Sequence, residues 1–256
     1  MIYDVAGFIN ANMLSKRFKE DSVVEVGIDE AGRGSFWGPI MAGAIIIPDE
    51  DTWTDKQRTL LTELRDSKKI SPKKRERLAD TIKELLPRIA VGVVSAEEIN
   101  ENGITWANME AFRRAVAGLG LEDVNSCRLV IDGVLAVDDW EGEQELIVEG
   151  DGMYMAIAGA SILAKVEHDR WIQKYCEDHP ECNERYDLIK SKGYGTANHR
   201  EGIRNYGAHA LHRSLYVQNW LPGATQKAKQ RAKPSSSASV KTVKEDVNKC
   251  LIRFNT

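Results

Sequence analysis

Long apolar runs and paired cysteines are both absent from this chain of 256 residues. No apolar stretch approaches the roughly 20 residues that a bilayer-spanning helix requires, and residues 1–20 lack the basic start, apolar centre and cleavage site of a secretory signal. The cysteines form no Cys-x-x-Cys pair, which argues against a zinc site and a disulfide framework; they are Cys127, Cys176, Cys182 and Cys250. These absences predict an intracellular, cytoplasmic protein with reduced thiols, with access to the nucleoid, or to the nucleus in a eukaryotic host.

Basic residues are scarce outside the C-terminal segment. Residues 224–256 hold eight Lys or Arg and two Asp or Glu, so they carry +6 within a total of −4, and residues 1–223 carry −10. An acidic body argues against a protein that coats nucleic acid nonspecifically, but it suits an enzyme with a local basic groove beside an acidic metal site. The Lys/Ser/Ala-rich tail is expected to be disordered. It is either a weak electrostatic tether for nucleic acid or a solvated extension without function.

Alternating strand-like and helix-like patterns predict an α/β fold in which helices flank a mixed β-sheet. Strands are expected at 23–29, 40–47, 88–95, 128–132 and 145–149, and helices at 71–86, 105–118 and 153–178. The chain is accordingly divided into an N-terminal helical extension (1–21), an α/β domain (22–178), a small helical C-terminal lobe (179–223) and a basic, disordered tail (224–256).

Two adjacent carboxylates, Asp29 and Glu30, stand at the end of the first expected strand and are followed by the turn Gly32-Arg33-Gly34. Carboxylates gather divalent cations, and a guanidinium between glycines suits a phosphodiester. The motif therefore indicates metal-dependent phosphodiester chemistry. Because neighbouring strand residues point to opposite faces, we expect the strand to end or kink here, and Glu30 is the weaker candidate for a direct ligand.

Two further acids, Asp132 and Asp151, also follow expected strands and precede glycines. Singly, an Asp before Gly is more often a turn former than a ligand. Three such positions at strand ends favour a shared site, because ligands bind at that edge of open α/β sheets. Converging carboxylates repel one another unless cations neutralise them, and two divalent ions would activate a water and stabilise the leaving oxygen.

These motifs resemble those of the ribonuclease HII (type 2 ribonuclease H) family, from about residue 22 to 217. Six blocks occur in the family's order: DEAGRG at 29–34, DSKK at 66–69, IDG at 131–133, GD at 150–151 leading into ASILAKV at 160–166, KGYGT at 192–196 and HRS at 212–214. The resemblance implies a ribonuclease H-like catalytic domain at 22–178. It also implies a catalytic and metal-binding tetrad for Mg²⁺ or Mn²⁺, with two ions in the catalytic complex, formed by Asp29, Glu30, Asp132 and Asp151.

The resemblance further implies that Gly32, Arg33 and Gly34 contact the 2′-hydroxyl and flanking phosphate of the substrate, and that Tyr194 senses the RNA–DNA junction. The 2′-hydroxyl is the group by which a protein tells RNA from DNA. Further substrate contacts are expected in the polar blocks, with solvated surface positions as the alternative for the lysines; they are Ser67, Lys68, Lys69, Lys165 and Lys192. The stretch 35–38 (Ser-Phe-Trp-Gly) is bulkier than is usual in the family.

The implied function is an endonuclease that hydrolyses RNA in RNA–DNA hybrids and incises duplex DNA 5′ to an embedded ribonucleotide, leaving 3′-hydroxyl and 5′-phosphate ends, in ribonucleotide excision repair. One alternative is a related nuclease that needs several consecutive ribonucleotides. The other is a catalytically silent nucleic-acid-binding protein. We expect a monomer without membrane association. A sliding clamp is a conceivable partner through the apolar residues 250–254, which could equally be incidental.

Overall fold

A five-stranded mixed sheet forms the centre of the protein. The computed structural model describes residues 13–123 and 126–224. The strand order is β3-β2-β1-β4-β5, with β1 antiparallel to β2, β2 antiparallel to β3, and β1, β4 and β5 mutually parallel. The strands are β1 (Glu25–Ala31), β2 (Ile40–Ile45), β3 (Ile89–Val94), β4 (Arg128–Asp132) and β5 (Gln144–Ile147). The mixed α/β fold predicted from the sequence is confirmed.

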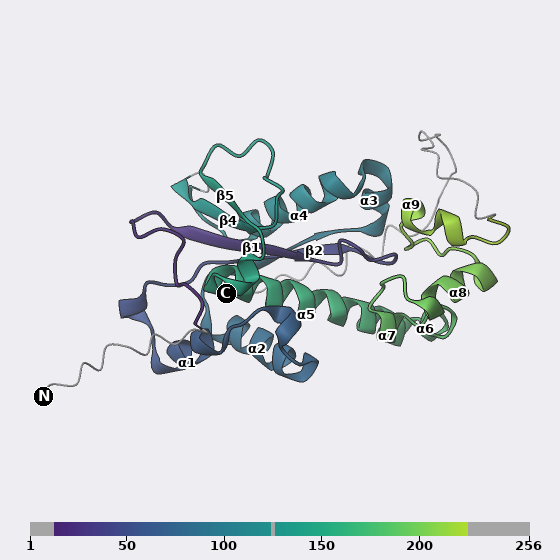
Figure 1. Ribbon diagram of the computed structural model, residues 1–256, viewed down its shortest axis with the longest axis horizontal. Helices are drawn as coiled ribbons and strands as arrows, with labels where there is room; N and C mark the ends of the chain where they lie inside the picture. Colours follow the sequence, from purple (N-terminus) through teal and green to yellow (C-terminus); the bar gives the residue numbers. More distant parts are fainter. Residues whose placement is uncertain (1–12, 124–125, 225–256) are drawn as a thin grey trace, which may run out of the picture.

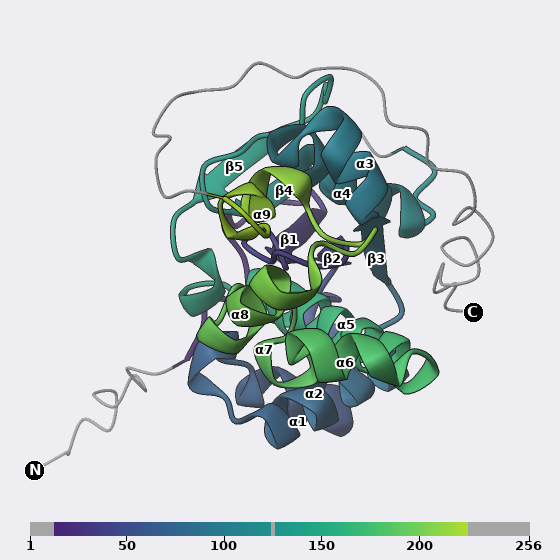
Figure 2. The ribbon, with the colours of Figure 1, turned by 90° about the vertical axis from the view of Figure 1, so that its right-hand side faces the viewer.

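Helices cover both faces of this sheet, as Figures 1 and 2 show. One face carries α3 (Ala96–Asn102) and α4 (Ile104–Gly118), and the other carries α1 (Asp55–Glu63), α2 (Pro72–Leu85) and the long α5 (Met155–Asp178). Each face has its own apolar core. Strand β2 is buried along its whole length, because its side chains enter both cores. The sheet is therefore fixed from two sides.

Helix α5 lies unusually close to β1 and β2. A Cβ atom added to Gly27 would come within 2.3 Å of the Ala156 carbonyl carbon, and one added to Gly43 within 2.3 Å of the Ala160 oxygen. The glycines on the strands and the alanines on the helix thus let two backbones meet almost directly. This contact sets the position of every group that α5 presents to the sheet.

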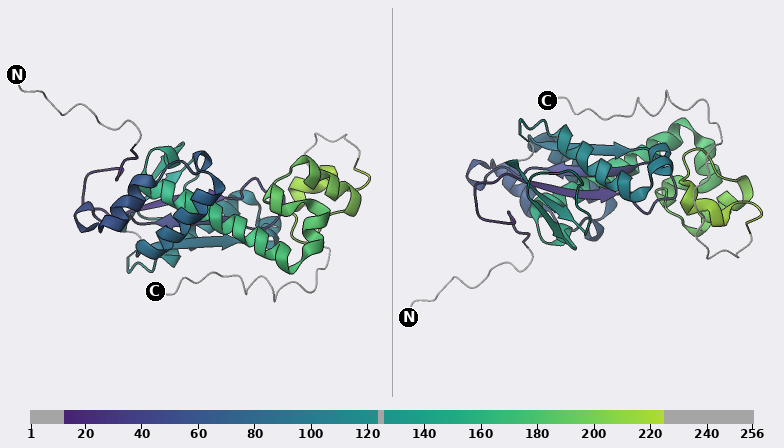
Figure 3. Two further views of the ribbon diagram at one scale, coloured as in Figure 1. Left: turned by 90° about the horizontal axis from the view of Figure 1, so that it is seen from below. Right: turned by 90° about the horizontal axis from the view of Figure 1, so that it is seen from above.

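Beyond residue 179 the chain forms short helices, as the sequence predicts. They are α6 (Pro180–Tyr186), α7 (Leu188–Ser191), α8 (Ala197–Tyr206) and α9 (Ser214–Val217). Figure 3 shows α5 running from beneath the sheet into this lobe. Trp37 is fully buried there, stacked on His209 with ring centroids 4.6 Å apart. The bulky residues after the 32–34 turn therefore fill the core of the lobe.

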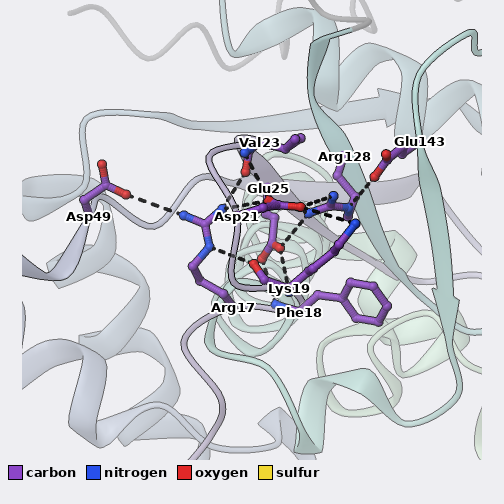
Figure 4. A network of polar contacts seen from close by, with 9 residues as sticks. All are labelled: Arg17, Phe18, Lys19, Asp21, Val23, Glu25, Asp49, Arg128 and Glu143. Atoms are coloured by element: carbon purple, nitrogen blue, oxygen red, sulfur yellow. Dashed lines mark hydrogen bonds and ion pairs between the residues drawn. The ribbon is translucent and has the colours of Figure 1, made fainter.

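The extension at 1–21 is not helical in its described part, 13–21, so that expectation is corrected there. The backbone of Ser15 instead bonds to Met153 and Met155, and the N–H groups of Phe18 and Lys19 donate to the Glu25 carboxylate. Figure 4 shows the ion-pair network that holds this segment on the sheet. Its centre is the fully buried Arg128, whose acidic partners are Asp21, Glu25 and Glu143. Residues 1–12, the tail at 225–256, and with it Cys250 and the patch 250–254, lie outside the described residues.

Helices α1 and α3 are absent from the sequence-based expectations. Both begin with a capping box, in which Thr54 pairs with Gln57 and Ser95 with Glu98. This S/T-x-x-E/Q spacing is a signal that could have revealed them. Among the described residues, no helix combines the length and the apolar character that crossing a bilayer demands.

The close approach of α5 predicts a large cost for any side chain at Gly43. Gly43→Ala should lower the free energy of unfolding by at least ~2 kcal/mol, because the methyl group must push the helix backbone away from β2. The matched control is Gly152→Ala, where an added Cβ meets nothing within 4 Å and the expected change is within about 0.5 kcal/mol. Urea unfolding at one pH measures both variants. Equal stabilities would contradict the packing argument.

Candidate active site

Asp29 and Glu30 point to opposite faces of the sheet. Strand β1 continues to Ala31 in regular register with β2, pairing Asp29 with Gly43 and Glu30 with Ala42. The expected end or kink of the strand is therefore wrong, because β2 holds the backbone extended beyond both acids.

The two faces give these acids different neighbours. Ser161 of α5 stabilises the charged form of Asp29, whereas Asn108 of α4 does so for Glu30. Asn108 is fully buried, and neither the nitrogen nor the oxygen of its side-chain amide makes a hydrogen bond within the described residues. Strand β1 thus places the Asp29 carboxylate on one face of the sheet and the Glu30 carboxylate on the other.

Asp132 and Asp151 are joined at the same edge by a backbone contact. Asp132 is the last residue of β4, and its Oδ1 accepts a hydrogen bond of 2.7 Å from the Gly150 N–H. This bond holds the short helix η4 (Gly150–Gly152), and with it the buried Asp151, against the strand end. Lys68 approaches from η2 (Ser67–Lys69) and places its Nζ 3.4 Å from Asp151 Oδ2.

The four acids act on one another electrostatically. Burial, followed by the charge of Glu30, raises the pKa of Asp29 well above its ordinary value. Burial also raises the pKa of Glu30, against the opposing charge of Arg33, and that of Asp151, against the opposing charge of Lys68. The charge of Asp132 contributes to all three increases in pKa. The edge therefore holds more negative charge than its surroundings compensate.

This donor set fits a hard divalent cation. All four groups are carboxylates, the ligands that Mg²⁺, Mn²⁺ and Ca²⁺ prefer. The raised pKa values of Asp29, Glu30 and Asp151 mean that added positive charge would stabilise their ionised forms. As they stand, no three His, Cys, Asp or Glu side chains of residues 13–123 and 126–224 lie close enough to enclose an ion. Lys68, whose side chain is 78% exposed, is the cation nearest to Asp151 and is free to swing away.

The 32–34 turn and Tyr194 lie side by side, although they are far apart in sequence. Ser35 and Tyr194 form an antiparallel bridge, and the N–H groups of Phe36 and Trp37 donate to the Gly193 carbonyl at 2.8 and 3.2 Å. Arg33 and Gly34 are exposed. Lys165 Nζ lies 5.3 Å from the centroid of the Tyr194 ring. Four of the predicted substrate contacts thus lie close together; they are Arg33, Gly34, Lys165 and Tyr194.

The remaining predicted substrate contacts, Lys69, Lys192 and Ser67, lie in different surroundings. Lys69 is exposed and pairs with Asp66 at 3.3 Å, whereas the charge of Lys192 acts on the Cys176 thiol near the end of α5. Ser67 is buried, with its Oγ 2.9 Å from that of Ser161. Its described contact is therefore internal: it supports the hydroxyl that faces Asp29.

Sequence reasoning missed Ser161 and Asn108 as site residues. The hydroxyl of Ser161 lies in a run of small residues that indicated only close packing. Asn108 is a polar residue on an otherwise apolar face of its helix, which is a usable signal. Arg213 was also noticed only as part of a block, and it proves to bond to the backbone of the 32–34 turn.

Two buried histidines, His199 and His212, form a hydrogen-bonded chain that ends at the backbone carbonyl of Tyr194. The His209 N–H donates to Nδ1 of His212, the two Nε2 atoms are 3.1 Å apart, and Nδ1 of His199 lies 3.0 Å from the Tyr194 carbonyl oxygen. Since a carbonyl only accepts, this chain is satisfied when His212 carries its proton on Nε2 and His199 on Nδ1. Both rings are therefore neutral, and burial lowers the pKa of each, that of His212 to about 3.

Comparison with known proteins identifies this architecture. The fold is that of an archaeal neighbour, the PCNA:RNase HII complex from Archaeoglobus fulgidus, with a TM-score of 0.59 and 23% identity over 81% of this chain and 98% of the other. The fold is thus ribonuclease H-like. A family model described as Ribonuclease HII matches residues 26–219. Two curated proteins named Ribonuclease HII are similar: that of Caldanaerobacter subterraneus subsp. tengcongensis is 36% identical over 81% of this chain and 80% of its own length, and that of Prochlorococcus marinus is 40% identical over 75% and 94%.

The chain belongs to the ribonuclease HII family. It is accordingly a ribonuclease H, an endonuclease.

The neutral histidine pair predicts a loss of stability in acid. The pKa of His212 is lowered from 6.5 to about 3 in the folded protein. Between these two pH values His212 is protonated in the unfolded chain and neutral in the folded chain, so acid favours unfolding. His212 alone should therefore cost about 2 kcal/mol of stability between pH 7 and pH 5. In His212→Gln the amide keeps a donor for His199 but cannot titrate. Urea unfolding at both pH values should show a correspondingly smaller loss for the variant, and an equal loss would contradict the assignment.

Proposed function

We propose that this ribonuclease H hydrolyses the RNA strand of RNA–DNA hybrids and incises duplex DNA on the 5′ side of an embedded ribonucleotide, leaving 3′-hydroxyl and 5′-phosphate ends. The observation that carries this proposal is the position of the exposed Arg33 and Gly34 beside Tyr194, adjoining the strand end where the four acids lie; Gly32, the first residue of the turn, is buried. The acidic edge, where the chemistry would take place, thus adjoins the surface that would contact the sugar.

At the acidic edge, Asp29, Glu30, Asp132 and Asp151 would hold Mg²⁺ or Mn²⁺, with two ions in the catalytic complex. Divalent cations there would neutralise the carboxylates, lower the pKa of a water and offset the charge on the leaving 3′ oxygen. Ser161 partly offsets the rise in the pKa of Asp29, and the Gly150 N–H donates to Asp132 and orients it. No side-chain nucleophile is required. Lys68, displaced from Asp151, would be available to a substrate phosphate.

On the adjoining surface, the turn residues Arg33 and Gly34 would contact the 2′-hydroxyl and the flanking phosphate. The backbone of a glycine-rich turn can approach a sugar where longer side chains would obstruct it. The Tyr194 ring would lie on the following deoxyribose and would collide with an added hydroxyl, which selects the RNA–DNA junction by shape. Lys165, beside the ring, supplies positive charge to the backbone.

The proposal extends to ribonucleotide excision repair in the cytoplasm and to a sliding clamp as partner. The Archaeoglobus fulgidus neighbour is a complex with PCNA. For this chain the clamp contact would fall on residues 250–254, outside the described residues.

Cleavage of an end-labelled DNA duplex with one ribonucleotide tests the proposal directly. With Mg²⁺ or Mn²⁺ we expect a single cut 5′ to the ribonucleotide, and none with EDTA. A parallel duplex with four consecutive ribonucleotides serves as control. Cleavage of the four-ribonucleotide duplex alone would assign a hybrid-only nuclease, and cleavage of neither duplex would favour the silent binder.

The acidic residues should be needed for chemistry and not for folding. Asp29→Asn and Asp132→Asn should each lower kcat by at least ~10²-fold, because a lost ligand removes several kcal/mol of transition-state stabilisation. Since the raised pKa means that ionised Asp29 destabilises the fold at neutral pH, Asp29→Asn should melt no lower than the wild type in EDTA. Asp80→Asn, which removes an exposed carboxylate paired with Arg170 on α2 and α5, is the control. Near-normal kcat in either active-site variant would exclude that residue from the mechanism.

A further inference from the structure

Arg213, between α8 and α9, is almost fully buried beneath the 32–34 turn. Its guanidinium donates to four backbone carbonyls. Nη1 bonds to Gly32 at 2.6 Å and to Arg33 at 2.9 Å, Nε bonds to Gly38 at 3.1 Å, and Nη2 bonds to Pro39 at 2.8 Å. One side chain of the C-terminal lobe thus forms hydrogen bonds with both ends of the loop that leads from β1 to β2.

The charge of Arg213 has no acidic partner. No carboxylate in the described ranges forms an ion pair with it, and burial lowers its pKa to about 10. Arg128 is the contrasting case: it is equally buried, but it pairs with three carboxylates, and its pKa is raised. Burying an unpaired cation is costly, and carbonyl dipoles offset only part of that cost. A purely structural link would not require a charge there.

The hydrogen bonds from Arg213 fix the direction in which the backbone N–H groups of the turn point. In a planar trans peptide the carbonyl and the following N–H point in opposite directions. Because the carbonyls of Gly32 and Arg33 point to Arg213, the N–H groups of Arg33 and Gly34 point away from it. Both residues are exposed, and neither N–H donates a hydrogen bond within the described part of the chain. Two successive outward N–H groups suit a sugar hydroxyl or a phosphate oxygen.

A weaker second contact acts on the same turn. The hydroxyl of Tyr216 in α9 donates to the Arg33 carbonyl at 3.1 Å, and the Arg213 N–H donates to the Phe36 carbonyl at 2.8 Å. The lobe therefore holds the turn through the backbone carbonyls of Gly32, Arg33 and Phe36.

We propose that Arg213 is the positioning residue for ribonucleotide selection: it holds the 32–34 turn so that the amides of Arg33 and Gly34 meet the 2′-hydroxyl and its phosphate. This inference rests on the proposed function. Arg213 touches none of the four acids in the described contacts, so its removal acts on substrate selection before it acts on chemistry.

The test compares Arg213→Lys with the wild type on the single-ribonucleotide duplex and on the four-ribonucleotide hybrid. Lysine keeps the charge, but one ammonium cannot span four carbonyls. We expect the ratio of kcat/KM for the single-ribonucleotide duplex to that for the hybrid to fall about 10-fold, mainly through KM, as loss of charged hydrogen bonds predicts. Arg128→Lys, the other buried arginine, should lower stability and leave this ratio unchanged.

Tyr216→Phe provides an independent reading if Arg213→Lys folds poorly, because it removes only one hydroxyl contact from the turn. It should shift the ratio in the same direction by about 2- to 3-fold. An unchanged ratio in Tyr216→Phe together with an unchanged or unmeasurable ratio in Arg213→Lys would overturn the positioning role while leaving the proposed function intact. A wild-type enzyme that does not cut the single-ribonucleotide duplex would contradict the proposed function itself.

Discussion

The backbone contact between α5 and the sheet is the constraint on which the rest of the structure depends. Gly27 and Gly43 have no side chain to separate β1 and β2 from the alanines of the helix. The same helix presents Ser161 to Asp29 and follows directly on Asp151, and its far half reaches the C-terminal lobe. A helix displaced by one methyl group would therefore move the acids and the substrate-facing lobe relative to each other.

The sequence predicts this fold well where its signals are local. Strand β2 is an apolar run, Ser71-Pro72 starts α2, and Asp132 ends a β-prone segment, so these elements need no knowledge of distant residues. The orientation of Asp29 and Glu30 depends instead on pairing with β2. That pairing keeps β1 extended through Ala31, and no local pattern reports it.

In the candidate site, too, local signals could be read from the sequence, whereas contacts between distant residues could not. The acids could be found from the sequence because three strand ends share one edge of the sheet. Of the groups that set their environment, Asn108 left a signal as a polar residue on an apolar helix face, whereas Ser161 did not. Ser67 belongs to a block that resembles a substrate contact, yet its hydroxyl is buried against Ser161. The segment at 13–21 is held by Arg128 and its acidic partners, and this distant network outweighs any local helix preference.

Departures from ordinary folding rules concentrate at one end of the molecule. Carboxylates with raised pKa values, an unpaired buried guanidinium and two exposed unbonded amides all lie at or beside the end of β1. Burial of the carboxylates and of the guanidinium destabilises the isolated protein, whereas the two amides are open to solvent, and added positive charge would stabilise the ionised carboxylates. Away from this site, Arg128 is neutralised by carboxylates, and each face of the sheet is covered by an apolar core. Well-satisfied regions supply the stability that the candidate site lacks, and such a concentration of unfavourable groups is typical of functional sites.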